Sequence, residues 1–180
     1  MTQIRKKKFR ILAVAPAVRG VGFAVLDADG TLADWGVKLI KGDKNKTSLA
    51  KIGKLMVESE PDLLVLEDAL AKGSFRSSRV RKLFQSVTEM AQGRNVRVKA
   101  YSREQYLGIL LPEGEYTKQA AAEFAARRFP DQLATQLPPK RKPWQTENYQ
   151  MAMFVAVALA LVARTKKLGQ RDKDYYRKPS

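Results

Sequence analysis

The sequence predicts a mixed α/β domain, with a five-stranded sheet that carries helices on both faces. Three observations support this prediction. Apolar runs at 9–16, 21–27 and 31–40 are separated only by tight turns, which indicates an antiparallel meander. Two later apolar runs alternate with segments of helical periodicity, the pattern of strands joined by helices. Hydrophobic residues make up 44% of the 180 residues, enough to build one core of ordinary size.

The first half of the chain contains four of these strands. Segment 9–16, FRILAVAP, lacks polar alternation and is therefore predicted to be a central strand covered on both faces. Segment 42–61 is predicted to be a helix, because its apolar residues recur along one face. Segment 61–70 is another buried strand, which ends at Glu67 and Asp68.

The second half predicts one more strand and four helices. Ser77 or Ser78 is a plausible N-cap for a helix that stops at Gly93, and Thr117 caps another. The remaining expected elements are a strand at 95–102 and helices at 103–111, 118–129 and about 145–167.

The two ends of the chain are polar and basic. Residues 1–8 are expected to form a basic arm, 9–167 a single domain, and 168–180 a flexible basic tail. No signal peptide is recognised, and the longest apolar run, 151–163, is shorter than the roughly 18 residues a membrane span needs. These features, with the absence of cysteine, predict a cytoplasmic protein without membrane contact.

Composition excludes several kinds of chemistry. Without cysteine and histidine, the chain has no thiolate nucleophile, no imidazole base and no Cys or His metal site. Any metal must be a hard cation such as Mg²⁺ or Mn²⁺ on carboxylate oxygens. The net charge of +16 and the isoelectric point near 10.2 favour nucleic acid as partner. An acidic protein or membrane surface is the alternative reading of the same charge.

Three apolar motifs follow one another along the chain. They are ILAVAPAVRGVGFAVLD at 11–27, LLVLEDA at 63–69 and MAMFVAVALAL at 151–161. In this order and spacing the sequence resembles the RuvC-type Holliday-junction resolvases, a branch of the ribonuclease H-like fold. The resemblance covers about 11–163, and it implies a ribonuclease H-like mixed sheet and a metal-dependent endodeoxyribonuclease ancestry.

The resemblance also implies a set of metal-binding carboxylates, and this chain lacks most of it. The family places acidic residues on the first strand, the fourth strand and the last helix, where two divalent ions activate water. The corresponding positions here are Ala15, Glu67 and Val155, with Ala152 one turn before Val155. Glu67 alone is left as a catalytic or metal-binding remnant.

Other carboxylates are poor substitutes. Asp68 is expected to point to the opposite face of its strand, and Asp27 lies at the far end of the second strand. Glu147 is expected near the start of the last helix, about two turns from Val155. Glu67 itself is either a residual one-metal ligand or a strand-end carboxylate paired with a nearby Arg or Lys.

Basic residues gather near the end of the fourth strand and before the last helix. Phe75, among them, could stack on a base, and small neighbours would let phosphates approach backbone amides. A solvated helix face is the alternative interpretation. The predicted nucleic-acid-binding residues are Arg19, Lys72, Arg76, Arg79, Arg81, Lys82, Lys140, Arg141 and Lys142.

These observations predict a RuvC-like nucleic-acid-binding protein whose catalytic metal ligands are largely lost. DNA, including branched junctions, is the favoured ligand, and RNA stays open. The family resemblance suggests a homodimer, because a four-way junction has two-fold symmetry. Two alternatives remain: an active metal-dependent crossover-junction endodeoxyribonuclease that uses Glu67 with partner residues not recognised in the sequence, and a non-enzymatic scaffold or regulatory partner in a nucleic-acid complex.

Overall fold

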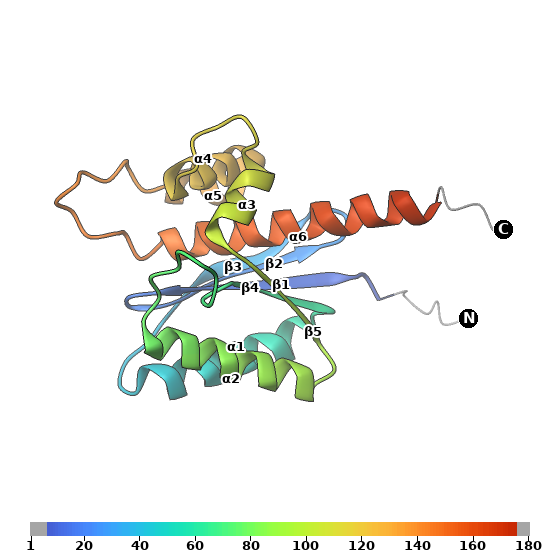
Figure 1. Ribbon diagram of the computed structural model, residues 1–180, viewed down its shortest axis with the longest axis horizontal. Coiled ribbons are helices and arrows are strands. Elements are labelled where there is room, and N and C mark those ends of the chain that lie inside the picture. The colour runs from blue at the N-terminus through green and yellow to red at the C-terminus, as the bar shows by residue number, and fades with distance from the viewer. Residues whose placement is uncertain (1–6, 176–180) are drawn as a thin grey trace.

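The computed structural model describes the backbone of residues 7–175 and the side chains up to Lys167 (Figure 1). The strands are β1 (Arg10–Ala17), β2 (Gly20–Asp27), β3 (Leu32–Leu39), β4 (Leu63–Glu67) and β5 (Arg97–Tyr101). The helices are α1 (Lys44–Ser59), α2 (Ser78–Gly93), α3 (Arg103–Leu110), α4 (Lys118–Arg128), α5 (Pro130–Leu133), the 3₁₀ turn η1 (Ala134–Gln136) and α6 (Met151–Tyr175).

The five strands form one mixed sheet in the order β3-β2-β1-β4-β5. The first three strands are an antiparallel meander, and β4 and β5 run parallel to β1. The predicted five-stranded mixed sheet is thereby confirmed. In this order the carboxyl ends of β1, β4 and β5 meet at one end of the sheet, where the loop after β4 also lies (Figure 1).

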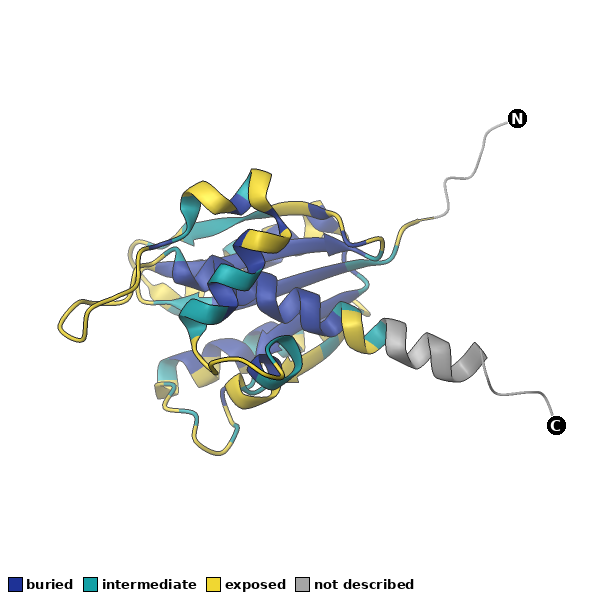
Figure 2. Cartoon of the chain, turned by 90° about the horizontal axis from the view of Figure 1, so that it is seen from above, coloured by how far each residue is buried: buried dark blue, intermediate teal, exposed yellow. Residues whose placement is uncertain are grey.

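Each face of the sheet has its own apolar core. On one face, Leu12, Val14 and their neighbours pack against α1 and α2. On the other face, Ile11, Ala13 and Ala15 pack against α3, α4, α5 and α6. From Met151 to Ala163, the central helix α6 is buried along the middle of the molecule, as Figure 2 shows. Helices therefore cover both faces, which explains why the central strands read as unbroken apolar runs.

Local capping explains where most helices begin. Ser77 accepts a hydrogen bond from Val80 N–H at the start of α2, and Thr117 accepts one from Ala120 N–H at the start of α4. Both predicted caps are confirmed. Ser102 and Gln105 form a reciprocal capping box at α3, which the sequence analysis did not anticipate. Segment 130–136, which follows α4, contains α5 and η1, and neither was predicted.

The predicted range of the last helix was wrong at both ends. The helix was expected over about 145–167, but α6 spans Met151–Tyr175. Residues before it form turns instead, because Asn148 Oδ1 accepts a hydrogen bond from Gln150 N–H and Lys142 C=O accepts one from Gln145 N–H. The segment expected to be a tail from 168 onwards thus begins inside a helix, and its last residues, 176–180, lie outside the described part.

The basic arm is described only at its end. Residues 1–6 lie outside the described part of the chain. Lys8 pairs with Asp29 at 3.1 Å, and Lys7 Nζ lies 3.9 Å from an Asp62 oxygen. No helix among the described residues meets the length and hydropathy that a bilayer crossing requires.

Candidate nucleic-acid interface

The strand register places the first-strand and fourth-strand positions of the predicted site next to each other. Val14 of β1 is paired with Leu66 of β4 in parallel, and one residue further along come Ala15 and Glu67. Side chains alternate along a strand, so both point to the face that α6 covers. The family resemblance implies that two metal-binding carboxylates lie side by side at these positions. Here the methyl group of Ala15 lies beside the carboxylate of Glu67.

The backbone of helix α6 packs directly against the sheet beside Ala15. Ala15 is paired with Gly22 of β2, and a Cβ placed on Gly22 would lie 2.2 Å from the carbonyl carbon of Ala152. Glycine is thus required for the first turn of α6 to rest on the sheet. Ala15 is 1% exposed, so the space around it is closed by packing.

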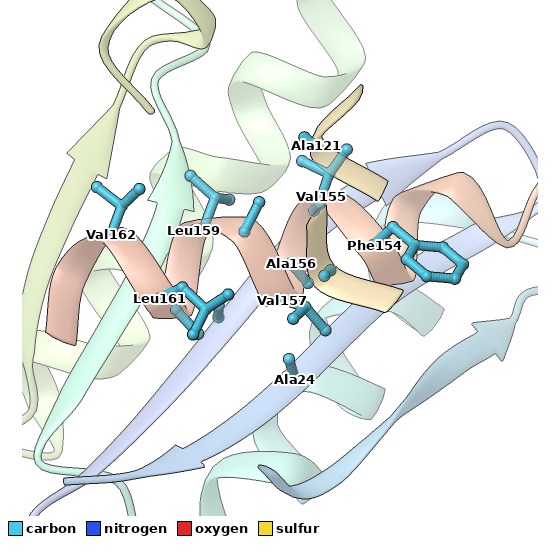
Figure 3. Close-up of a cluster of buried hydrophobic side chains, with 14 of the residues drawn as sticks. Ala24, Ala121, Phe154, Val155, Ala156, Val157, Leu159, Leu161 and Val162 are labelled. Atoms are coloured by element: carbon cyan, nitrogen blue, oxygen red, sulfur yellow. The ribbon is translucent and has the colours of Figure 1, made fainter. Parts of the chain in front are cut away.

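Val155 also belongs to the apolar core. It is buried in the cluster that includes Ala121 of α4, and Figure 3 shows both side chains among other aliphatic groups. A carboxylate at this position would be surrounded by hydrocarbon and would need a cation to offset its desolvation. The first-strand and last-helix positions are therefore ordinary core positions in this chain.

Glu67 lies in a different environment. Its side chain is 8% exposed, and Oε2 accepts two hydrogen bonds from Arg76, one from Nε at 2.9 Å and one from Nη2. Arg76 belongs to the loop between β4 and α2, nine residues further along the chain. This ion pair is the contact with a nearby arginine that the sequence offered as one of two interpretations of Glu67.

The residues present do not fit a two-metal centre. Two divalent ions need several carboxylate oxygens, whereas Glu67 is held by a guanidinium and both Ala15 and Val155 are apolar. Within the described residues, no three acidic side chains form a group that could hold a metal ion.

The other acidic residues weighed as substitutes are engaged elsewhere. Asp27 pairs with Arg10 at 2.8 Å, and Glu147 pairs with Lys118 at 2.9 Å. Asp68 accepts a hydrogen bond from the N–H of Leu70. Glu147 was expected within the last helix, but it lies in the loop before α6 because that helix starts at Met151.

A pocket of about 820 Å³ opens beside the Glu67–Arg76 pair. Its walls come from the loop after β4, the start of α3 and the start of α4, and the aromatic rings of Phe75 and Tyr116 take part in them. Phe75 is 99% exposed. The charged side chains that line it are Glu67, Asp68, Lys72, Arg76, Arg103, Glu104 and Lys118.

Tyr106 lies beneath this region and has one unusual feature. The ring is fully buried, and among buried side-chain atoms of the described residues its hydroxyl is the one without a hydrogen-bond partner. Burial, and secondarily the negative charge of Glu67, raise the pKa of the Tyr106 phenol above its ordinary value. The hydroxyl therefore stays neutral at all ordinary pH values.

The predicted basic residues do not all gather at one place. Lys72 and Arg76 line the large pocket, while Arg81 and Lys82 line a second, apolar pocket of about 550 Å³ beside α2. Arg79 donates a hydrogen bond to Asn45 Oδ1. Arg19 is exposed in the turn between β1 and β2.

Three of the predicted residues lie in the long loop before α6. Lys140, Arg141 and Lys142 are exposed, and Lys142 Nζ lies 5.4 Å from the ring centroid of Trp144. This loop extends from the same end of the molecule as the loop after β4 (Figure 1). The two basic segments therefore flank one end of the sheet, although no contact places Lys140–Lys142 in the pocket.

Sequence reasoning missed three residues of the large pocket: Arg103, Tyr116 and Lys118. Arg103 is the first residue of α3, directly after the N-cap that follows β5. Its place at the carboxyl end of a strand parallel to β4 was the available signal, because such ends meet at one edge of a sheet. Lys118 similarly follows the predicted cap Thr117.

Comparison with solved structures identifies the fold. RuvC from Thermus thermophilus matches with a TM-score of 0.63 and 18% identity, over 89% of this chain and 97% of that chain. The T. thermophilus RuvC in complex with a Holliday junction substrate matches with 0.59 and 16%, over 89% and 96%. The yeast mitochondrial Holliday junction resolvase Ydc2 matches with 0.56 and 11%, over 93% and 85%. No family model and no curated protein sequence matches the chain.

The mixed sheet, its strand order and the helices on both faces define the class as an α/β protein with a ribonuclease H-like fold. Within that class, the chain has the RuvC-type fold. Both predictions of fold are thereby confirmed. At identities below one fifth, the likeness carries the fold and no more.

Proposed function

We propose that this protein binds branched DNA, including four-way junctions, without metal-dependent cleavage. The observation that carries the proposal is the Glu67–Arg76 pair. Glu67 lies at the strand position where the resemblance to the RuvC-type fold places a metal-binding carboxylate, and here it binds a basic side chain instead. Loss of positioned metal ligands costs nuclease activity many orders of magnitude, whereas phosphate binding needs only surface cations. The protein would then recognise DNA without cutting it.

Two further features support binding. The net charge of +16 favours a polyanionic ligand. One of the similar structures is a RuvC in complex with a Holliday junction substrate. A protein of this fold with basic segments at one end of the sheet is suited to DNA of the same shape. We expect it to act on DNA recombination or repair intermediates in the cytoplasm, and a homodimer would match the two-fold symmetry of a junction.

The test is a paired gel assay with an end-labelled four-way junction. One lane series contains Mn²⁺ and is run under denaturing conditions, and the other lacks metal and is run natively. We expect a shifted junction, no nicks, and weaker binding to a linear duplex of the same arm sequence. Affinity should fall steeply with salt, because cations released from phosphates drive binding.

The alternatives give different results. Symmetric Mn²⁺-dependent nicks that disappear in Glu67→Gln would identify an active endonuclease. Binding that is absent or insensitive to salt would favour a scaffold that contacts proteins. An RNA four-way junction of the same sequence, run in parallel, decides between the two nucleic acids, because strand charge alone does not distinguish them.

A further inference from the structure

We propose that the guanidinium of Arg76 is a fixed cation that binds DNA phosphate in the pocket beside Glu67, in place of a divalent metal ion. The inference rests on the proposed function, because it assumes that DNA phosphates enter this pocket. It goes further by naming the group that carries the charge and by predicting binding that is independent of metal.

The geometry of the pair leaves Arg76 able to bind a ligand. Nε and one N–H of Nη2 are directed to the same Glu67 oxygen, so three of the five guanidinium N–H groups are left for another acceptor. The Arg76 side chain is 26% exposed, and it lines the pocket of about 820 Å³. A phosphate in this pocket can therefore accept hydrogen bonds from the outer edge of the guanidinium.

The buried carboxylate gives Arg76 its fixed position. A Glu67 side chain that is 8% exposed needs a counter-charge, and the guanidinium of Arg76 supplies it. A planar guanidinium also matches two phosphate oxygens at once, which a flexible ammonium group does not. Glu67 thus acts as a positioning residue, and Arg76 contacts the ligand.

The rest of the pocket suits a phosphate with an attached nucleoside. Besides the Glu67–Arg76 pair, the lining has three basic side chains and two acidic ones: Lys72, Arg103 and Lys118 against Asp68 and Glu104. The hydroxyl-bearing residues Ser74 and Ser102 are small enough for a phosphate to approach closely. The exposed ring of Phe75 offers a surface for a base. The two serines and Phe75 come from the loop after β4 and from the start of α3, directly after β5.

The experiment measures fluorescence anisotropy of a labelled four-way junction with four variants at constant ionic strength. They are Arg76→Gln, Glu67→Gln, the double variant Glu67→Gln/Arg76→Gln, and Arg94→Gln as the matched control. Arg94 donates to the Gly53 carbonyl at the far end of α2, so its change removes the same charge outside the pocket. The double variant removes the charge without leaving a buried, unpaired carboxylate, so it keeps the test valid if Arg76→Gln folds poorly.

We expect wild-type affinity to be the same in EDTA and in millimolar Mg²⁺. The double variant and Arg76→Gln should bind about tenfold more weakly, which corresponds to loss of a charge-assisted contact. Glu67→Gln should bind more tightly, because the amide oxygen can still accept from Arg76 while the negative charge beside the phosphate is removed. Arg94→Gln should change affinity by about twofold through general charge. The inference is overturned if the wild type needs a divalent ion, or if the Arg76 variants match Arg94→Gln.

A second probe separates this inference from the proposed function. The same variants are titrated with a 5′-phosphorylated thymidine tetranucleotide and, separately, with Mn²⁺ followed by electron paramagnetic resonance. If the wild type ignores junctions but binds the tetranucleotide through Arg76, the proposed function is wrong and the inference holds. Stoichiometric Mn²⁺ binding by the wild type that Glu67→Gln removes would overturn the inference whatever the junction result.

Discussion

The end of the sheet has two halves that differ sharply. At β1, β2 and α6, Ala15 and Val155 are buried among apolar groups, and the backbone of α6 rests on Gly22. At β4, Glu67 and Arg76 are charged and border an open pocket. In the ribonuclease H-like arrangement that the resemblance implies, these two halves would face one metal site.

The difference shows how each half can accommodate a carboxylate. Where α6 packs on the sheet, an uncompensated carboxylate would be costly, and small apolar residues occupy these positions. Where the pocket is open, Glu67 has Arg76 as its partner, and the pair borders solvent. The two halves therefore tolerate a carboxylate to different degrees, because only one of them supplies a counter-charge.

Restoring acidic residues in the apolar half should have the largest effect. Ala15→Asp/Val155→Asp buries two carboxylates in hydrocarbon, and we expect the free energy of unfolding to fall by more than about 4 kcal/mol in EDTA. Mn²⁺ should restore little of this stability, because Arg76 still holds Glu67. Urea unfolding, with and without Mn²⁺, measures both effects.

Adding Arg76→Gln to these two substitutions frees Glu67 for a metal. Mn²⁺ should now raise the urea midpoint of the triple variant, because binding to the native state alone is stabilising. If Mn²⁺ leaves the midpoint unchanged, Ala15 and Val155 are not the positions at which the resemblance places metal ligands.

Gly22→Ala tests the packing of the same half by adding a single methyl group. That carbon would lie 2.2 Å from the backbone of Ala152, so α6 must shift. We expect a loss of about 3 kcal/mol in urea unfolding, at the upper end of overpacking effects. Gly93→Ala is the control, because its new Cβ would meet nothing within 4 Å at the end of α2, and it should be neutral or slightly stabilising. Equal effects for the two variants would contradict the close approach of α6.

The sequence predicted the apolar half better than the polar half. Strand positions follow from apolar runs and turn residues, and Ala15 and Glu67 become neighbours once two parallel strands are aligned. The predicted start of α6 was wrong, because polar residues such as Asn148 fit a helix pattern but form local turns here. Apolar periodicity does not reveal where such a helix begins.

The polar half depends on loop conformation, which periodicity does not encode. Arg76 was predicted to bind nucleic acid, but its pairing with Glu67 depends on how the loop after β4 folds back. Arg103 and Lys118 enter the same pocket from two different helices. Contacts between residues so far apart in the chain follow only from the assembled fold.

Phe75→Ala tests whether the polar half serves binding rather than folding. A side chain that is 99% exposed contributes little to folding, so the free energy of unfolding should change by less than about 0.5 kcal/mol. Junction affinity should fall about tenfold, because stacking of a base on an aromatic ring is lost. Anisotropy measures the affinity, and Phe75→Tyr should retain it. An unchanged affinity for Phe75→Ala would show that no base reaches this ring.

Tyr106→Phe gives the smallest effect, and it reports on the boundary between the two halves. The buried hydroxyl has no partner among the described residues, so its removal should stabilise the protein by about 1 kcal/mol in urea unfolding at neutral pH. Burial raises the pKa of the phenol above its ordinary value of 10.0, so the folded state keeps the proton at a pH where the unfolded state loses it. Stability should therefore decline as pH rises above 10.0, and the decline should be shallower for Tyr106→Phe than for the wild type. A destabilised variant would indicate that the hydroxyl makes a hydrogen bond in solution, for example to water that reaches it from the Glu67 pocket.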